Sequence, residues 1–141
     1  NAKELADALG AFLHPDDGDW MERTRSRLEC THLLLTLGER GMALQTGAGE
    51  LVRVPTVAQG VYDVSGAGDT VTAVMAVALA SGASAPEAAI LANHAAAVEV
   101  TKAGVATVAP REILAHVDEL PETIGAPTAP IEPDPRTPEH P

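Results

Sequence analysis

The sequence predicts an α/β protein, because short apolar strands precede long apolar helices along the chain. Residues 32–37 form a continuous apolar run ended by Gly38, a pattern typical of a strand buried on both faces of a parallel sheet. Residues 42–45 and 51–54 are strand-like runs on either side of a glycine-containing turn, which predicts a hairpin. Residues 67–80 are mostly small and apolar and form too long a run for a strand, so we expect a buried helix there.

Further helices are expected on both sides of these segments. Apolar residues up to Phe12 recur at helical spacing, which predicts an amphipathic helix over residues 3–13. Other helices are predicted over residues 20–29, 86–101 and 110–117, the first with a solvated surface of alternating charges. Residues 121–141 are rich in proline and poor in apolar side chains, which predicts a disordered tail or linker after a single domain of residues 1–120.

The composition limits the classes of partner. The chain of 141 residues is 45% hydrophobic, which is enough for one core. Nine basic residues against twenty acidic ones give a net charge of -11, so we expect no nucleic acid as a partner. A nucleotide remains compatible with this charge, because backbone N–H groups at a helix start hold an anion whatever the net charge of the protein.

Cysteine usage and hydropathy indicate the compartment. Cys30 is the only cysteine, so no internal disulfide forms, and we expect an inert thiol in a reducing, cytoplasmic protein. No apolar run approaches the roughly 20 residues of a membrane span, so no membrane association is expected. The chain begins at Asn1 without an initiator Met or a signal segment, which suggests that its start is a cut.

The segment with the clearest chemical meaning is Asp63-Val-Ser-Gly-Ala-Gly-Asp69, which leads into the apolar helix. Gly66 and Gly68 allow close backbone approach and positive φ, and a helix start offers unpaired N–H groups and the positive end of the dipole. Asp69 lies at the same helix start, where a carboxylate can take the proton of a hydroxyl that attacks phosphorus. On spacing alone, Asp69 is equally well explained as a helix cap.

Five segments, in order, resemble the ribokinase or PfkB family of carbohydrate kinases. The pattern Asp63-x-x-Gly-Ala-Gly-Asp69 followed by a small-residue helix resembles the second signature of this family. Residues 36–41 resemble its strand and turn beside the nucleotide, and residues 92–97 resemble its adenine-side helix. Residues 104–110 resemble its closing segment, and Asn1-Ala-Lys-Glu4 resembles its N-x-x-E motif. The resemblance covers residues 1 to about 117. Within the family, residues 54–64 and Val74 resemble the branch that phosphorylates heptose 7-phosphate for ADP-heptose synthesis.

The resemblance implies a fold and a set of site residues. The fold would be the C-terminal portion of a ribokinase-like three-layer α/β/α sandwich, with strand 33–37 central and helix 68–80 packed on it. By the resemblance, the anion hole falls on Gly66, Ala67 and Gly68, and the base is Asp69. The expected ATP contacts are Gly38, Gly41, Asn93 and Gly104, and Mg²⁺ would be held through water by Asn1 and Glu4. A monovalent cation such as K⁺ would be held by Asp63 and Ser65, with carbonyls near Lys102 and Gly104. Some members of the family lack this last ion.

Several of these residues also have simple structural explanations. Asn1 and Glu4 fit an N-cap with a first-turn acid, and Asn93 fits a polar residue on a helix face. We expect His94 to be a surface or packing histidine.

The resemblance also implies what the chain lacks. Complete members carry an N-terminal half that binds the sugar, so the expected partners are that half, a sugar phosphate and, in the complete enzyme, a second copy in a homodimer. Two functions stay open: half of a sugar kinase, for heptose 7-phosphate or another sugar or nucleoside, and a non-catalytic nucleotide-binding remnant. An intact Gly66 to Asp69 turn favours the kinase, and the lack of an N-terminal half favours the remnant.

Overall fold

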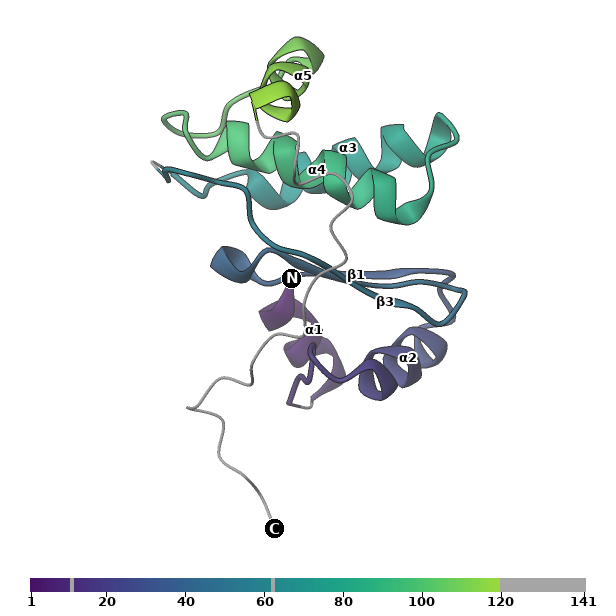
Figure 1. The fold of residues 1–141 in the computed structure, drawn as a ribbon. Coiled ribbons are helices and arrows are strands. Elements are labelled where there is room, and N and C mark those ends of the chain that lie inside the picture. Colours follow the sequence, from purple (N-terminus) through teal and green to yellow (C-terminus); the bar gives the residue numbers. More distant parts are fainter. Residues whose placement is uncertain (11, 62, 120–141) are drawn as a thin grey trace.

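The computed structural model describes residues 1–10, 12–61 and 63–119, which form three layers with an additional helix on top. Helices α1 (Ala2–Leu9) and α2 (Gly18–Arg27) lie on one side of a small sheet (Figure 1). Helices α3 (Ala67–Ala80) and α4 (Ala85–Glu99) lie on the other side, and α5 (Pro110–Glu119) packs against α4. Among the described residues, no helix has the length and apolar character of a membrane span.

The sheet is antiparallel and has β2 (Met42–Gln45) between β1 (Leu33–Thr36) and β3 (Leu51–Val54). The predicted hairpin of β2 and β3 is confirmed, with Met42 opposite Val54. The prediction that strand 33–37 is central and parallel is wrong for this chain, since β1 is an edge strand of the described sheet. A short 3₁₀ turn, η1 (Gly38–Arg40), reverses the chain so that β1 pairs with β2 as a second hairpin. Burial on both faces belongs to β2, whose four residues are all buried.

The alternation of side chains along β2 divides the core in two. Met42 and Leu44 point toward α3 and α4, where they pack with Val71 and small residues of α4. Ala43 faces the opposite way and packs with Leu35 and the fully buried Met21 of α2. The sheet therefore has an apolar cluster on each face, as a layered α/β fold requires.

Helix α4, rather than α3, is the buried helix. It begins with a capping box between Ser84 and Glu87 and has nine buried residues. The prediction that residues 67–80 are buried is wrong, because α3 buries only Val71 and Ala78 while Val77 remains 67% exposed. Helix α3 packs mainly on α4 and leaves its other face open.

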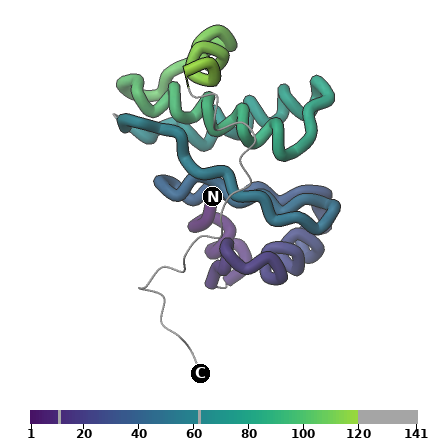
Figure 2. Tube along the Cα trace, in the orientation of Figure 1, coloured from purple at the N-terminus to yellow at the C-terminus, as the bar shows by residue number. Residues whose placement is uncertain are grey.

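The remaining helix boundaries differ from the sequence prediction for identifiable reasons. Helix α1 ends at Leu9 because Gly10 adopts a left-handed conformation, and Phe12 lies beyond the helix with 91% of its surface exposed. Helix α2 begins earlier than predicted because Asp17 accepts hydrogen bonds from the first-turn amides, and it buries one face rather than being solvated all round. Figure 2 shows the chain passing from these purple helices through the blue hairpins to the green helices. The predicted tail, residues 121–141, lies outside the described residues.

Candidate functional site

The turn before α3 has the backbone conformation expected of an anion-binding helix start. Gly66 is the N-cap residue with φ of 94°, and no side chain caps the helix. A Cβ on Gly66 would lie 2.9 Å from Oε1 of Glu99, whereas a Cβ on Gly68 would meet nothing within 4 Å. The left-handed conformation therefore belongs to Gly66 alone, and the expectation of positive φ at Gly68 is wrong. The backbone of Gly68 instead faces open space.

Two adjoining cavities meet at this turn. The first has a volume of about 400 Å³ and mostly apolar walls, which include Met42, Val61, Val64, Asn93, Ala96, Ala97 and Val100. The second has a volume of about 370 Å³ and includes Glu4, Asp69 and Thr72 in its walls. Asn1, Thr36, Gly68 and Val71 line both cavities. The start of α3 thus separates a mostly apolar cavity, which Glu39 also lines, from a cavity lined by Glu4 and Asp69.

Asp69 lies in the first turn of α3 and lines only the second cavity. The interpretation of Asp69 as a helix cap is wrong, because Gly66 is the N-cap residue and no side chain caps this helix. Its carboxylate makes no hydrogen bond or ion pair with any of the described residues. The carboxylate is exposed and available to a ligand in the cavity.

Asn1 and Glu4 form a capping box at the start of α1. Oδ1 of Asn1 accepts from the backbone N–H of Glu4 at 3.0 Å, and Oε2 of Glu4 lies 2.6 Å from the terminal nitrogen of Asn1. Both residues also line the second cavity, which brings them to the same space as Asp69. Over the part of the chain that the structure describes, no group of three or more His, Cys, Asp or Glu side chains is placed to hold a metal ion. The magnesium role of Asn1 and Glu4 stays a prediction.

The turn between β1 and β2 lines the first cavity through Gly38 and Gly41. Both glycines have positive φ, of 62° and 79°. A Cβ at Gly41 would collide with the carbonyl oxygen of Val54, so glycine is required there for the hairpin to close. At Gly38 a Cβ would meet no neighbour, and its backbone borders the cavity.

Asn93 lies on α4, is buried, and lines the first cavity. Its Nδ2 donates a hydrogen bond of 2.7 Å to the carbonyl oxygen of Pro55, in the segment that follows β3. The side chain therefore ties that segment to α4 and does not lie on a solvated helix face.

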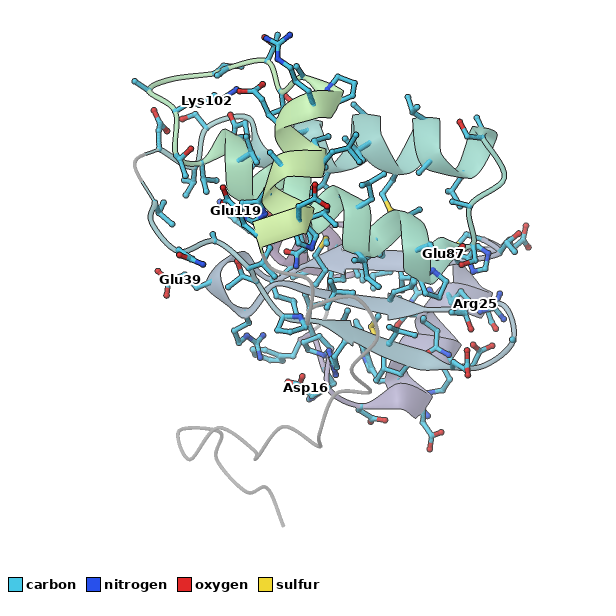
Figure 3. All side chains as sticks on the ribbon, turned by 45° about the horizontal axis from the view of Figure 1, so that its top comes forward. Asp16, Arg25, Glu39, Glu87, Lys102 and Glu119 are labelled. Atoms are coloured by element: carbon cyan, nitrogen blue, oxygen red, sulfur yellow. The ribbon has the colours of Figure 1, made fainter. Side chains whose placement is uncertain are left out.

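Asp63 connects the loop before α3 to the loop after α4. Its carboxylate accepts the backbone N–H of Ser65 at 2.8 Å and of Gly104 at 3.2 Å, and its own N–H donates to the carbonyl oxygen of Val100. The hydrogen bond from Ser65 is the main cause that lowers the pKa of Asp63, with a smaller contribution from Gly104. Lys102, which is labelled in Figure 3, lies in the loop after α4 and pairs with Glu112 of α5 at 2.8 Å.

One buried polar group, Glu99, escaped the sequence analysis, and a second, His94, has one of its two predicted environments. Glu99 is fully buried at the end of α4, and neither of its carboxylate oxygens has a hydrogen-bond partner among the described residues. Between Glu87 and Lys102 the sequence has no other Asp, Glu, Lys or Arg, a signal that could have drawn attention to Glu99. His94 is fully buried as well, with Nδ1 lying 2.8 Å from Nδ1 of His116 on α5, so its interpretation as a packing histidine holds and that as a surface histidine does not.

Comparison with known sequences connects these features to one family. The model of the pfkB family carbohydrate kinases matches residues 1–112. The bifunctional protein HldE of Trichlorobacter lovleyi is 45% identical over 121 residues, which are 83% of this chain and 24% of the relative. HldE of Pelobacter propionicus is 48% identical over 127 residues, covering 84% of this chain and 26% of the relative. The chain spans about a quarter of the length of these curated relatives.

Solved structures with a similar fold include ribokinases from a bacterium and a plant. The ribokinase of Thermotoga maritima matches with a TM-score of 0.71 and 28% identity, over 83% of this chain and 39% of that chain. The Arabidopsis thaliana ribokinase complexed with ribose and ATP has a TM-score of 0.72 and 26% identity over the same shares. Phosphofructokinase-2 of Escherichia coli, in complex with potassium, has a TM-score of 0.73 and 19% identity over 84% of this chain and 39% of that chain.

The ribokinase-like architecture expected from the sequence is confirmed as a partial α/β fold of this type. The glycine turn, the open carboxylate of Asp69 and the match over residues 1–112 agree with one another. This chain belongs to the pfkB family of carbohydrate kinases.

Proposed function

We propose that this chain forms the nucleotide-binding part, with the general base, of a kinase that transfers the γ-phosphoryl group of ATP to a sugar hydroxyl. The observation that carries the proposal is the position of Gly68, which lines both cavities while Asp69, the next residue, lines only the second. A nucleotide in the apolar first cavity would place its phosphates at the start of α3. Its terminal phosphate would then lie beside the carboxylate that serves as the base.

The residues around the junction supply binding and proton transfer. Backbone N–H groups of the first turn of α3, with the positive end of the helix dipole, hold the phosphates in the Gly66 to Gly68 turn. Asp69 accepts the proton of the acceptor hydroxyl as it attacks phosphorus. Asn1 and Glu4, in the second cavity, would hold Mg²⁺ through water, and the ion would offset the charge of the phosphates.

Heptose 7-phosphate is the acceptor that the sequence favours. The approach to the glycine turn, residues 54–64, resembles the heptose branch of the family, and the relatives at 45% and 48% identity carry the name HldE. Another sugar or a nucleoside is the alternative, and a panel of acceptors assayed with the complete enzyme distinguishes them. We place the enzyme in the cytoplasm, as its single free cysteine and its nucleotide substrate suggest.

The acceptor-binding surface would come from a further half of the kinase. The chain spans 39% of the ribokinase chains that it matches, and α3 leaves the apolar side chains of Val77 and Leu79 exposed. The edge of β1 is also unpaired within the described sheet. We therefore assign residues 1–120 to the nucleotide side of the kinase domain and residues 121–141 to a linker or tail, and we expect the complete enzyme to form a homodimer.

Replacement of Asp69 by Asn in the complete enzyme tests the proposal. Asn keeps the size of the side chain and loses the basicity, so turnover is expected to fall by about 10²-fold or more while ATP affinity stays nearly constant. Asp118→Asn, at an exposed position of α5, is the matched control and should leave both quantities unchanged. An unchanged turnover number in Asp69→Asn would contradict the catalytic role. A complete protein that binds ATP and phosphorylates no acceptor of the panel would favour a non-catalytic nucleotide-binding function.

A further inference from the structure

Glu99 is a buried carboxylate whose charge is not matched by any neighbour in the described chain. The residue is 0% exposed, and both Oε1 and Oε2 are without a hydrogen-bond partner among the described residues. Such a group is costly, because an unpaired carboxylate loses its hydration when it is buried away from water. The cationic side chain nearest in the sequence, Lys102, is already engaged by Glu112 and by the carbonyl oxygen of Thr107.

The position of this carboxylate is specific. Oε1 of Glu99 lies 2.9 Å from the point where a Cβ of Gly66 would stand, so the carboxylate touches the back of the phosphate turn. Val100, the next residue, accepts the backbone N–H of Asp63 through its carbonyl oxygen. Glu99 therefore lies where the loop before α3 meets the loop after α4.

The same loops offer the ligands that a monovalent cation prefers. In the described structure, the carbonyl oxygens of Thr101, Lys102 and Ala103 accept no hydrogen bond. Carbonyl oxygens can replace the hydration shell of K⁺, and carboxylate oxygens add the opposite charge. The oxygens of Asp63 both already accept backbone N–H groups, so the carboxylate of Glu99 is the unengaged one. The donor set thus fits the monovalent cation that the family resemblance implies for this loop.

We propose that Glu99 is a direct ligand of a monovalent cation bound between the loop before α3 and the loop after α4. The resemblance to the family assigned Asp63 and Ser65 to such an ion and gave no role to Glu99. Without the ion, a negative charge on Glu99 would lie beside the turn that is proposed to hold the phosphates and would oppose their binding. With the ion, that charge is neutralised. Glu99 is thus a positioning residue that makes the phosphate turn depend on the cation.

Thermal unfolding in K⁺ tests this inference without any turnover. We compare the wild-type protein with Glu99→Gln and with Glu50→Gln, a control at an exposed position. Each protein is melted in KCl and in choline chloride at the same ionic strength, so that general screening of the net charge of -11 is equal in both salts. K⁺ is expected to raise the melting temperature of the wild type and of Glu50→Gln, because a ligand that binds only the folded state stabilises it. Glu99→Gln is expected to melt higher than the wild type in choline, since the buried charge is gone, and to gain much less from K⁺ than the wild type does.

Binding is measured independently by NMR of thallium(I), a K⁺ substitute, displaced by KCl. The half-saturating concentration is expected to rise by about 10-fold or more in Glu99→Gln. If Glu99→Gln does not fold, Glu99→Asp takes its place, and the inference expects this variant to need more K⁺ than the wild type. An equal response to K⁺ in the wild type and the Glu99 variant, or no response in the wild type, overturns the inference. These readouts involve no phosphoryl transfer, so their failure leaves the proposed kinase function intact, and a failure of the Asp69 test leaves the cation site intact.

Discussion

The two glycines of the phosphate turn are expected to respond in opposite ways to the same small substitution. Gly66 has φ of 94°, a conformation that costs a non-glycine residue about 1–2 kcal/mol. A methyl group there would also stand 2.9 Å from Oε1 of Glu99 and 3.3 Å from Cγ1 of Val105. Together these effects should lower the free energy of unfolding of Gly66→Ala by about 2–3 kcal/mol. For a domain of this size, that corresponds to a fall in melting temperature of roughly 10 °C.

Gly68 has neither constraint. Its φ is not positive, and a methyl group would meet no atom within 4 Å. Because Ala is the better helix former by up to about 1 kcal/mol, Gly68→Ala should be as stable as the wild type or more stable. The methyl group would, however, enter the space shared by the two cavities, where the phosphates are proposed to lie. We expect ATP affinity to fall by about 10-fold, equivalent to roughly 1.4 kcal/mol.

Circular dichroism melts and ATP titrations by calorimetry separate the two effects. The expected pattern is a destabilised Gly66→Ala and a stable Gly68→Ala with weak ATP binding. Unchanged ATP affinity in a well-folded Gly68→Ala would refute the location of the phosphates at this turn. A stable Gly66→Ala would refute the assignment of the strained conformation to residue 66.

The stability of the helical layer gives two further predictions. Burial, and secondarily the nearby His116, lower the pKa of His94, so the folded protein binds its proton less readily than the unfolded chain does. The free energy of unfolding should therefore be constant above about pH 6.5 and fall below it by at most about 1.4 kcal/mol per pH unit. Urea unfolding at several pH values measures this dependence. His94→Asn should reduce the slope of stability against pH. Ser84→Ala removes the hydroxyl of the capping box at the start of α4 and should lower the free energy of unfolding by about 1 kcal/mol, whereas Ser81→Ala, beyond the end of α3, should have little effect.

Features determined by local chemistry could be predicted from the sequence. The hairpin of β2 and β3 followed from two apolar runs around a glycine turn, and the antiparallel pairing of these two strands confirms it. Helix α4 followed from Ser84 and Pro86 at its start. The glycine turn before α3 followed from the spacing of Gly66 and Gly68, although the sequence did not distinguish which glycine has the left-handed conformation.

Features determined by distant packing could not be predicted. The apolar, small-residue sequences of α3 and α4 are alike, and only the tertiary arrangement puts α4 against the sheet and leaves Val77 exposed on α3. The strand at residues 33–36 was apolar enough for a central strand, but the tight η1 turn pairs it with β2 at an edge. Lys102 is near Glu99 in the sequence but pairs with Glu112, so the position of the unpartnered Glu99 carboxylate beside Gly66 becomes visible only in three dimensions.

A complementation assay tests the central claim most directly. The chain is incubated with ATP, Mg²⁺ and heptose 7-phosphate, alone and with the N-terminal half of the kinase supplied as a separate polypeptide. Phosphoryl transfer requires the acceptor to be held in line with the phosphate in a closed site, so we expect product only when both halves are present. The same mixture with Asp69→Asn should be about 10²-fold slower. Robust turnover by the chain alone would contradict the assignment of the acceptor site to the N-terminal half. Equal turnover with Asp69→Asn in the mixture would contradict the assignment of the base to this chain.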